Sequence, residues 1–323
     1  MALFGKKAKD NGHTIAILDV ENGSVAAALA RLTPNDPPKL FAETRIRMPI
    51  LNSLDTRLMT REIEKATREA LGHISRVAAR IRLHDGLSSN GEVERSAAFF
   101  SPPWAAMHLE GGTADYAPHM SELVQNLLQE TFGDKRSTLH PFGTAAAHSA
   151  VLLYPHLGST MLCIVSGEVT ELLVIENNRV VGRATVPVGF YSLLRTLTMH
   201  AGISAAEARS LLSLASGEHT TFIEPLVAAQ SHFANAFAEA AAELLERSRV
   251  ENVLVIAPHP VEEWFARALA EDSALIELFP PNSTVRAIRA QHAMPYIAAH
   301  ALKPDLPLML EALFVDAKFS GIK

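Results

Sequence analysis

Two short stretches of the chain carry residues that could bind a phosphorylated ligand and a metal ion. In the first, LDVENGS at 18–24, an aspartate ends an apolar run and a glycine and a serine follow. A carboxylate at a strand end can hold Mg²⁺, usually through water, and N–H groups near a glycine can approach a phosphate. We therefore treat Asp19 as a candidate metal ligand and Gly23 and Ser24 as candidate phosphate ligands. A plain turn capped by an acid explains the same residues without any ligand.

The second stretch, TMLCIVSGEVTELLVI at 160–175, interrupts one apolar run and begins another. Such a pattern predicts a hairpin whose turn presents backbone N–H groups. Its candidate ligand-binding residues are Ser166, Gly167, Glu168 and Thr170. For Glu168 a solvated turn acid is the simpler interpretation, and Thr170 is expected to begin a strand.

The elements expected to position these residues alternate between strands and helices. TIAILD at 14–19 and the third strand at 40–50 flank a segment that fits a returning strand or a short helix. Residues 56–83 repeat apolar positions at threes and fours, which predicts an amphipathic helix. Further strands and helices are expected at 95–104, 114–132, 137–153, 161–165, 170–177, 179–189, 190–200, 203–215, 222–248, 250–260 and 261–272.

The order of these elements and three short motifs resemble the actin-like ATPase superfamily, in its bacterial branch that contains FtsA and PilM. LDVENGS resembles the first phosphate loop, and residues 164–189 resemble the second, with its hairpin. VLVIAPHPVEEWFARAL at 253–269 stands at the place of the adenosine motif. The resemblance implies an α/β, actin-like (ribonuclease H-like) fold of two lobes with a small inserted α+β subdomain.

The resemblance divides the chain into parts with different expected roles. Residues 1–12 would be a flexible tail, and residues 13–50 with 137–160 would form the first lobe. Residues 51–136 would be the inserted subdomain, where such families contact partners and where an extended peptide could add as a strand. Residues 161–323 would form the second lobe.

The three motifs depart from the pattern that a working ATPase needs. On the family's Asp-x-Gly-Gly-x-x-Thr pattern, Ile164 replaces the aspartate and Ser166 replaces the first glycine. An aliphatic side chain cannot hold hydrated Mg²⁺. In the third motif the prolines at 258 and 260 remove N–H donors and add bulk. We predict that ATP hydrolysis is absent or very slow, and that binding of ATP and Mg²⁺ is weak or absent.

Composition excludes several other functions. The net charge of −6 disfavours a nucleic-acid footprint, because such surfaces need clustered Lys and Arg. Cys163, the single cysteine, excludes an internal disulfide and lies in an apolar run, so it is expected to be a buried packing residue. No apolar run reaches the ~20 residues of a membrane span. The segment at 308–323 is expected to be a helix that closes the body of the fold.

The resemblance implies a scaffold protein in the cytoplasm that can associate with the inner face of the membrane. It would recruit the cytoplasmic segment of a membrane protein, or another copy of itself, in cell division or pilus assembly. One alternative is a retained ATPase in which Asp19 binds Mg²⁺. Another is a sugar-kinase-like or phosphatase-like enzyme, for which no convincing catalytic acid stands at 140–148.

Overall fold

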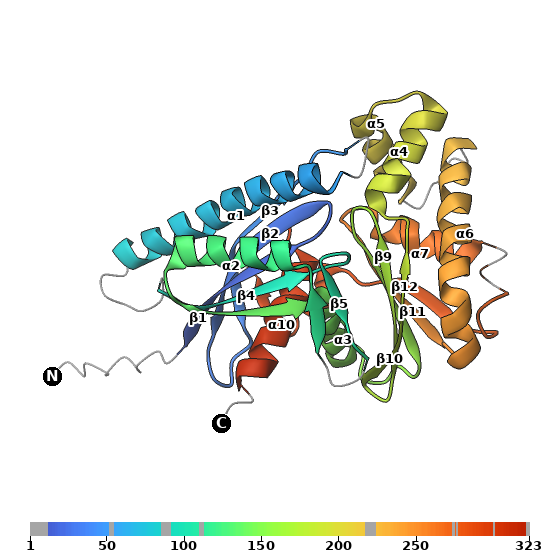
Figure 1. Cartoon of the computed structure of the whole chain (residues 1–323). Helices are drawn as coiled ribbons and strands as arrows, with labels where there is room; N and C mark the ends of the chain where they lie inside the picture. The colour runs from blue at the N-terminus through green and yellow to red at the C-terminus, as the bar shows by residue number, and fades with distance from the viewer. Residues whose placement is uncertain are drawn as a thin grey trace.

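The computed structural model describes residues 12–51, 55–84, 92–109, 113–216, 224–272, 275, 277–299 and 301–320. These residues form two α/β lobes that lie side by side, each built on its own β-sheet (Figure 1). The expected tail at 1–12 falls almost wholly outside the described residues. Among those that are described, no helix combines the length and apolar character needed to span a bilayer.

The first lobe is built on a six-stranded sheet in the order β13-β3-β2-β1-β4-β7. β1, β2 and β3 form an antiparallel meander, and β4 and β7 continue the sheet parallel to β1. The segment at 24–32, for which the sequence left a strand or a short helix open, is therefore a strand, and its residues are all buried. The strands are β1 His13–Val20, β2 Ser24–Leu32, β3 Lys39–Arg47, β4 Val93–Phe100, β7 Arg136–Pro141 and β13 Ala298–Ala299.

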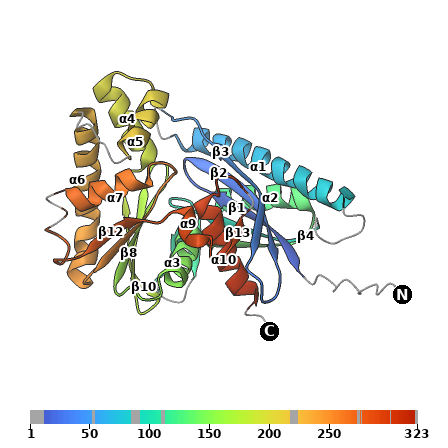
Figure 2. The same cartoon turned by 180° about the vertical axis from the view of Figure 1, so that it is seen from behind.

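Helices cover both faces of this sheet. α1 and α2 pack together on one face, where the apolar positions of α1, such as Ile63 and Ile74, are buried. α3 and α10 pack against each other on the opposite face, as seen from behind in Figure 2. The bounds are α1 Thr56–His84, α2 Pro118–Phe132, α3 Phe142–Leu153 and α10 Leu306–Ser320.

The expectation of an inserted subdomain at 51–136 is wrong for most of that segment. β4 pairs with β1 on one side and with β7 on the other, so it lies inside the main sheet of the first lobe. Because both of its edges are paired, β4 offers no edge for strand addition. Among the described residues of this segment, only a short hairpin of β5 Ala105–Met107 and β6 Ala114–Tyr116 forms a separate sheet.

The second lobe is built on a five-stranded sheet in the order β10-β9-β8-β11-β12. β8, β9 and β10 form the predicted meander, and β11 and β12 extend it in parallel. The turn from β9 to β10 uses Asn177 and Asn178, both with positive φ (50° and 63°), as a tight hairpin requires. The strands are β8 Thr160–Val165, β9 Thr170–Glu176, β10 Arg179–Val186, β11 Asn252–Ile256 and β12 Thr284–Ala287.

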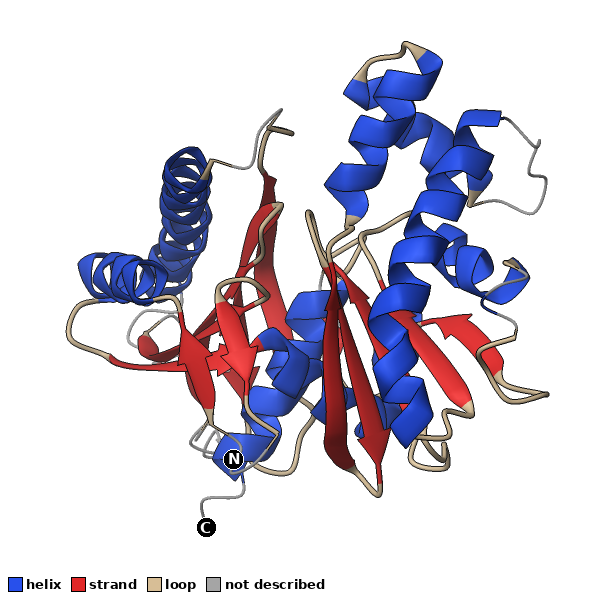
Figure 3. Cartoon of the chain, turned by 45° about the vertical axis from the view of Figure 1, so that its right-hand side comes forward, coloured by secondary structure: helices blue, strands red, loops and turns tan. Residues whose placement is uncertain are grey.

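The helices of the second lobe cover one face of its sheet and rise above it (Figure 3). Their apolar faces share one core with β8, which includes the buried Cys163 as expected. A capping box begins α5, with Ser204 and Glu207 hydrogen-bonded reciprocally. These helices are α4 Phe190–Ala201, α5 Ala205–Ala215, α6 Glu224–Arg247 and α7 Glu262–Glu271. The short α9 Ala290–Ala293 instead packs near α10, in the core that α10 shares with β1 and β2.

The last helix belongs to the first lobe and not to the second. Leu308, Met309 and Leu310 of α10 are fully buried in a core that includes residues of β1, β2 and α3. This burial confirms that the segment is a helix of the body of the fold. It also corrects the expected boundary, because residues 306–320 return to the first lobe.

Candidate functional site

A cavity of about 550 Å³ lies between the two lobes. Its first-lobe wall comes from the ends of β1 and β3, and its second-lobe wall from the turn after β8 and the loop after β11. The segment 303–307, which leads into α10, closes a third side. All three predicted motifs therefore meet at one place, although they are spread over 250 residues of sequence.

Five of the seven predicted site residues line this cavity: Asp19, Gly23, Ser24, Ser166 and Gly167. The other two are engaged elsewhere. The Glu168 carboxylate forms an ion pair with Arg195 on α4, and the Thr170 hydroxyl donates a hydrogen bond to the carbonyl of Val188 (2.8 Å). Glu168 is therefore not the solvated turn acid that the sequence suggested, because only 7% of it is exposed.

The two loops expected to hold phosphate contact each other directly. A Cβ placed on Gly23 would lie 2.8 Å from the Cα of Gly167. The Oδ1 atom of Asn22 accepts a hydrogen bond from the backbone N–H of Glu168 (2.7 Å), and its Nδ2 donates to the carbonyl of Pro102 (2.7 Å). An N–H group of the second loop is thus used by a protein side chain, and no space for a phosphate remains between the two glycines.

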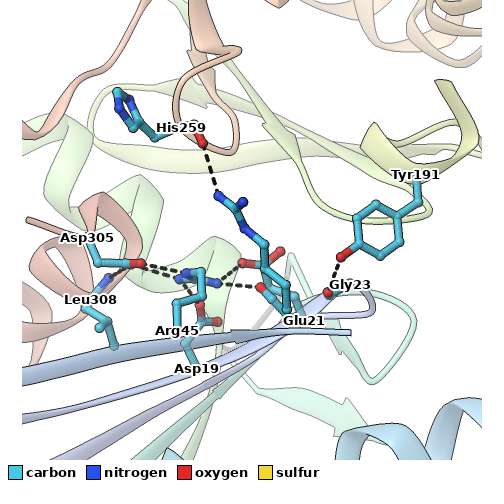
Figure 4. A network of polar contacts seen from close by, with 10 residues as sticks. Asp19, Glu21, Gly23, Arg45, Tyr191, His259, Asp305 and Leu308 are labelled. Carbon is cyan, nitrogen blue, oxygen red and sulfur yellow. Dashed lines mark hydrogen bonds and ion pairs between the residues drawn. The ribbon is translucent and has the colours of Figure 1, made fainter. Parts of the chain in front are cut away.

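Further hydrogen bonds hold the lobes together on either side of this contact. The Tyr191 hydroxyl of α4 lies 2.7 Å from the carbonyl oxygen of Gly23 and 3.0 Å from that of Met48 (Figure 4). At the other end of the interface, Arg183 of β10 donates to the carbonyl of Met107 (2.8 Å). Arg183 also lies 3.5 Å from the buried carboxylate of Glu171, whose pKa is raised to about 7 by burial.

The guanidinium of Arg45, on β3, fills the space beside Asp19 (Figure 4). It donates five hydrogen bonds, which matches the number of its N–H groups. Nε and Nη2 form a fork on Asp305 (2.6 and 2.8 Å), and Nη2 also reaches Asp19 Oδ2 (2.7 Å). Nη1 donates to Ser24 Oγ (2.7 Å) and to Glu21 Oε1.

Carboxylates outnumber cations around this guanidinium. Burial raises the pKa of Asp19 and of Glu21, and Arg45 opposes that rise. Glu311 on α10 is fully buried nearby, and its pKa is raised well above the usual range by burial and then by Asp19. Asp19 Oδ1 and both carboxyl oxygens of Glu311 lack a hydrogen-bond partner.

Ile164 and the proline-containing loop at 257–260, two departures from the ATPase pattern, both lie at the cavity. Ile164 is buried at the end of β8 and lines the cavity where the family pattern has an acid. Ala257 and Pro258, in the loop after β11, line the same cavity. The His259 ring, with 69% of its side chain exposed, lies 3.1 Å from Glu262, and its carbonyl accepts a hydrogen bond from Arg47 (3.4 Å).

The residues present do not fit Mg²⁺ and ATP. The carboxylate that would hold the metal ion is paired with a guanidinium, and the loops that would hold the phosphates pack on each other. Where α3 begins, the cavity is lined by Phe142, so this wall offers no acid to activate water. In the described part of the chain, no group of three or more acids, histidines or cysteines is arranged to hold a metal ion.

Solved structures show which fold this is. No family model matches the sequence, and no curated protein matches it. The chain is similar to PilM in a PilM–PilN type IV pilus biogenesis complex (10% identity, TM-score 0.53, 98% of this chain and 100% of that chain). It is also similar to the ethanolamine utilization protein EutJ of Carboxydothermus hydrogenoformans (13%, 0.52, 93% and 90%) and to a Ppx/GppA family member of Aquifex aeolicus (11%, 0.51, 97% and 99%).

The chain has the two-lobed actin-like fold. At identities this low the likeness shows the fold alone, and these three neighbours differ in function by their names. The fold class expected from the three degenerate motifs is therefore confirmed.

Sequence reasoning missed the residues that complete the site. Arg45, Glu21 and Asp305 form the ion network with Asp19, and Asn22 and Tyr191 bind the loops together. One signal was available: Arg45 lies in β3 beside Ala26 of β2, the strand that follows Asp19 and Glu21. Asp305 gave no local signal, since it lies 260 residues from Arg45 in the sequence.

Proposed function

We propose that the chain is an actin-like assembly protein that recruits a protein partner and does not turn over ATP. The observation that carries this proposal is the contact of Gly23 with Gly167, at the place where a phosphate chain would have to lie. Phosphoryl transfer depends on positioned phosphates and a bound metal ion. The cleft of this chain supports neither.

We further propose that the partner is the cytoplasmic segment of a membrane protein, and that the chain works at the inner face of the membrane. The fold supports this by its likeness to PilM, which is found in a complex with PilN. Roles of the FtsA and PilM type, in cell division or pilus assembly, agree with such a scaffold. Self-association is a second mode of assembly consistent with this fold.

The test of the first part is calorimetric titration of the purified chain with ATP and Mg²⁺, together with an assay of phosphate release. We expect no saturable binding at micromolar ATP and no phosphate release above that of buffer. Asp19→Asn should behave like the parent chain in both assays. Micromolar binding, with phosphate release that Asp19→Asn abolishes, would instead support a retained ATPase.

The test of the second part is photo-crosslinking in cells, followed by titration of synthetic cytoplasmic segments of the captured membrane proteins. We expect one such segment to bind the purified chain saturably, and its scrambled version not to bind. If every captured segment binds no better than its scrambled control, the recruitment of a membrane protein is refuted.

A further inference from the structure

We infer that the guanidinium of Arg45 is a resident cation that stands in for a divalent metal ion, and that its removal turns the surrounding carboxylates into a metal site. The inference rests on the proposed loss of Mg²⁺ and ATP binding in the cleft. It adds that the cation-binding chemistry of this place persists and is satisfied by the chain itself.

The number and geometry of the contacts indicate a built cation site. Each N–H group of Arg45 has an oxygen acceptor, and the acceptors come from β1, the turn after it, the start of β2 and the turn before α10. Four of the five acceptors are carboxylate oxygens, of Asp19, Glu21 and Asp305. Only 19% of the arginine side chain is exposed, and 1% of the side chain of Asp19.

The site has more negative charge than one guanidinium neutralises. Three carboxylates contact Arg45 directly, and the carboxyl group of Glu311 lies close enough to have its pKa altered by Asp19 and Arg45. Asp19 Oδ1 is buried and has no hydrogen-bond partner. Carboxylate and hydroxyl oxygens are the ligands that Mg²⁺, Mn²⁺ and Ca²⁺ take in proteins.

Arg45 also links β1 to the turn before α10, because it donates hydrogen bonds to both Asp19 and Asp305. Asp305 accepts from Arg45 and, through Oδ1, from the N–H of Leu308 in the first turn of α10 (3.3 Å). The first lobe is thereby linked to its returning helix without any ligand. The arrangement of the cleft should accordingly not respond to metal ions or chelators in the parent chain.

The experiment measures Mn²⁺ binding to the Arg45→Ala chain through loss of the EPR signal of free Mn²⁺. We expect one Mn²⁺ per chain, bound more tightly than by the parent by about tenfold or more. Addition of Mn²⁺ should raise the melting temperature of this variant and leave that of the parent unchanged. Asp305→Asn added to Arg45→Ala should weaken Mn²⁺ binding again, because it removes a ligand.

The matched control is Arg195→Ala. Arg195, on α4, is also a partly buried arginine that forms an ion pair, but it lies outside the lining of the cavity and pairs with the single acid Glu168. Its removal should create no Mn²⁺ site. Equal Mn²⁺ binding by the two variants would overturn the inference, since it would show that loss of any arginine suffices.

A second variant covers the case in which Arg45→Ala does not fold. Arg45→Met keeps the length of the side chain and removes its charge, and folding of either variant is monitored by circular dichroism. A folded variant that binds no Mn²⁺ refutes the inference, and so does Mn²⁺ binding at this site by the parent. ATP turnover by the parent would refute the proposed function in a separate assay, whatever the variants bind.

Discussion

Gly23 and Gly167 come from opposite lobes, and a Cβ on Gly167 would lie 2.6 Å from the Cα of Gly23. Real Cβ atoms do not approach a backbone carbon so closely, so only glycine fits at either position while the loops remain in contact. The closed arrangement of the cleft is therefore encoded in two residues without side chains.

Gly23→Ala should destabilise the chain by about 1–3 kcal/mol, because the added methyl group forces the two loops apart. Gly72→Ala is the matched control, since its Cβ on α1 would meet only the flexible end of Arg76 at 3.5 Å. We expect the control to stabilise the helix by up to about 1 kcal/mol. Urea denaturation of both variants measures the difference, and a neutral Gly23→Ala would contradict the described contact.

Tyr191→Phe should loosen the junction between the lobes. The variant leaves the carbonyls of Gly23 and Met48 without their hydroxyl donor, at a cost of about 1–3 kcal/mol. Hydrogen exchange at the backbone amides near 23 and 48 should rise. Tyr296→Phe, at an exposed tyrosine, should leave exchange there unaltered. Equal exchange in the two variants would show that the hydroxyl does not hold the lobes.

Glu171 should make stability fall as the pH rises. Burial raises its pKa from 4.5 to about 7 in the folded chain, so the folded state binds its proton more tightly than the unfolded state. The contribution of this proton to the free energy of unfolding is complete below pH about 4.5 and is lost as the pH rises through about 7. Glu171→Gln should flatten that part of the curve in urea titrations from pH 4 to 8. An unchanged slope would mean that Glu171 is ionised in the fold.

Glu311→Gln should stabilise the chain more at pH 8 than at pH 5. The pKa of Glu311 is raised well above its ordinary value, so its ionised form is the one that folding disfavours. The amide of glutamine carries no titratable proton, so the variant avoids this cost at both pH values. Thermal unfolding at the two pH values tests this, and destabilisation by the same amount at both would argue for a packing role alone.

Local sequence patterns predicted most elements but not how they pair. The three-strand hairpins and the helices at 56–83 and 222–248 follow from apolar spacing, because each forms within a short stretch. The position of β4 between β1 and β7 depends on two crossovers and leaves no local trace. For that reason a segment of the main sheet looked like an insertion.

The sequence predicted only those residues of the candidate site that stand in local turn motifs. Asp19 and the two glycines stand in recognisable turns, whereas the role of Arg45 depends on how β3 is bent. Ala42 has a positive φ of 58°, and the register of β2 with β3 shifts beside it, between Ala27 and Leu29. A bulge of this kind re-aims the following side chains, so simple alternation along β3 could not place Arg45.

The return of α10 to the first lobe has a consequence for how the chain is made. Its buried leucines complete a core that contains residues of β1 and β2, which leave the ribosome some 280 residues earlier. During translation the part of the first-lobe sheet that α10 covers must therefore stay exposed while the whole second lobe is synthesised. Folding of this lobe is a late event, and chaperones would meet its exposed face before α10 does.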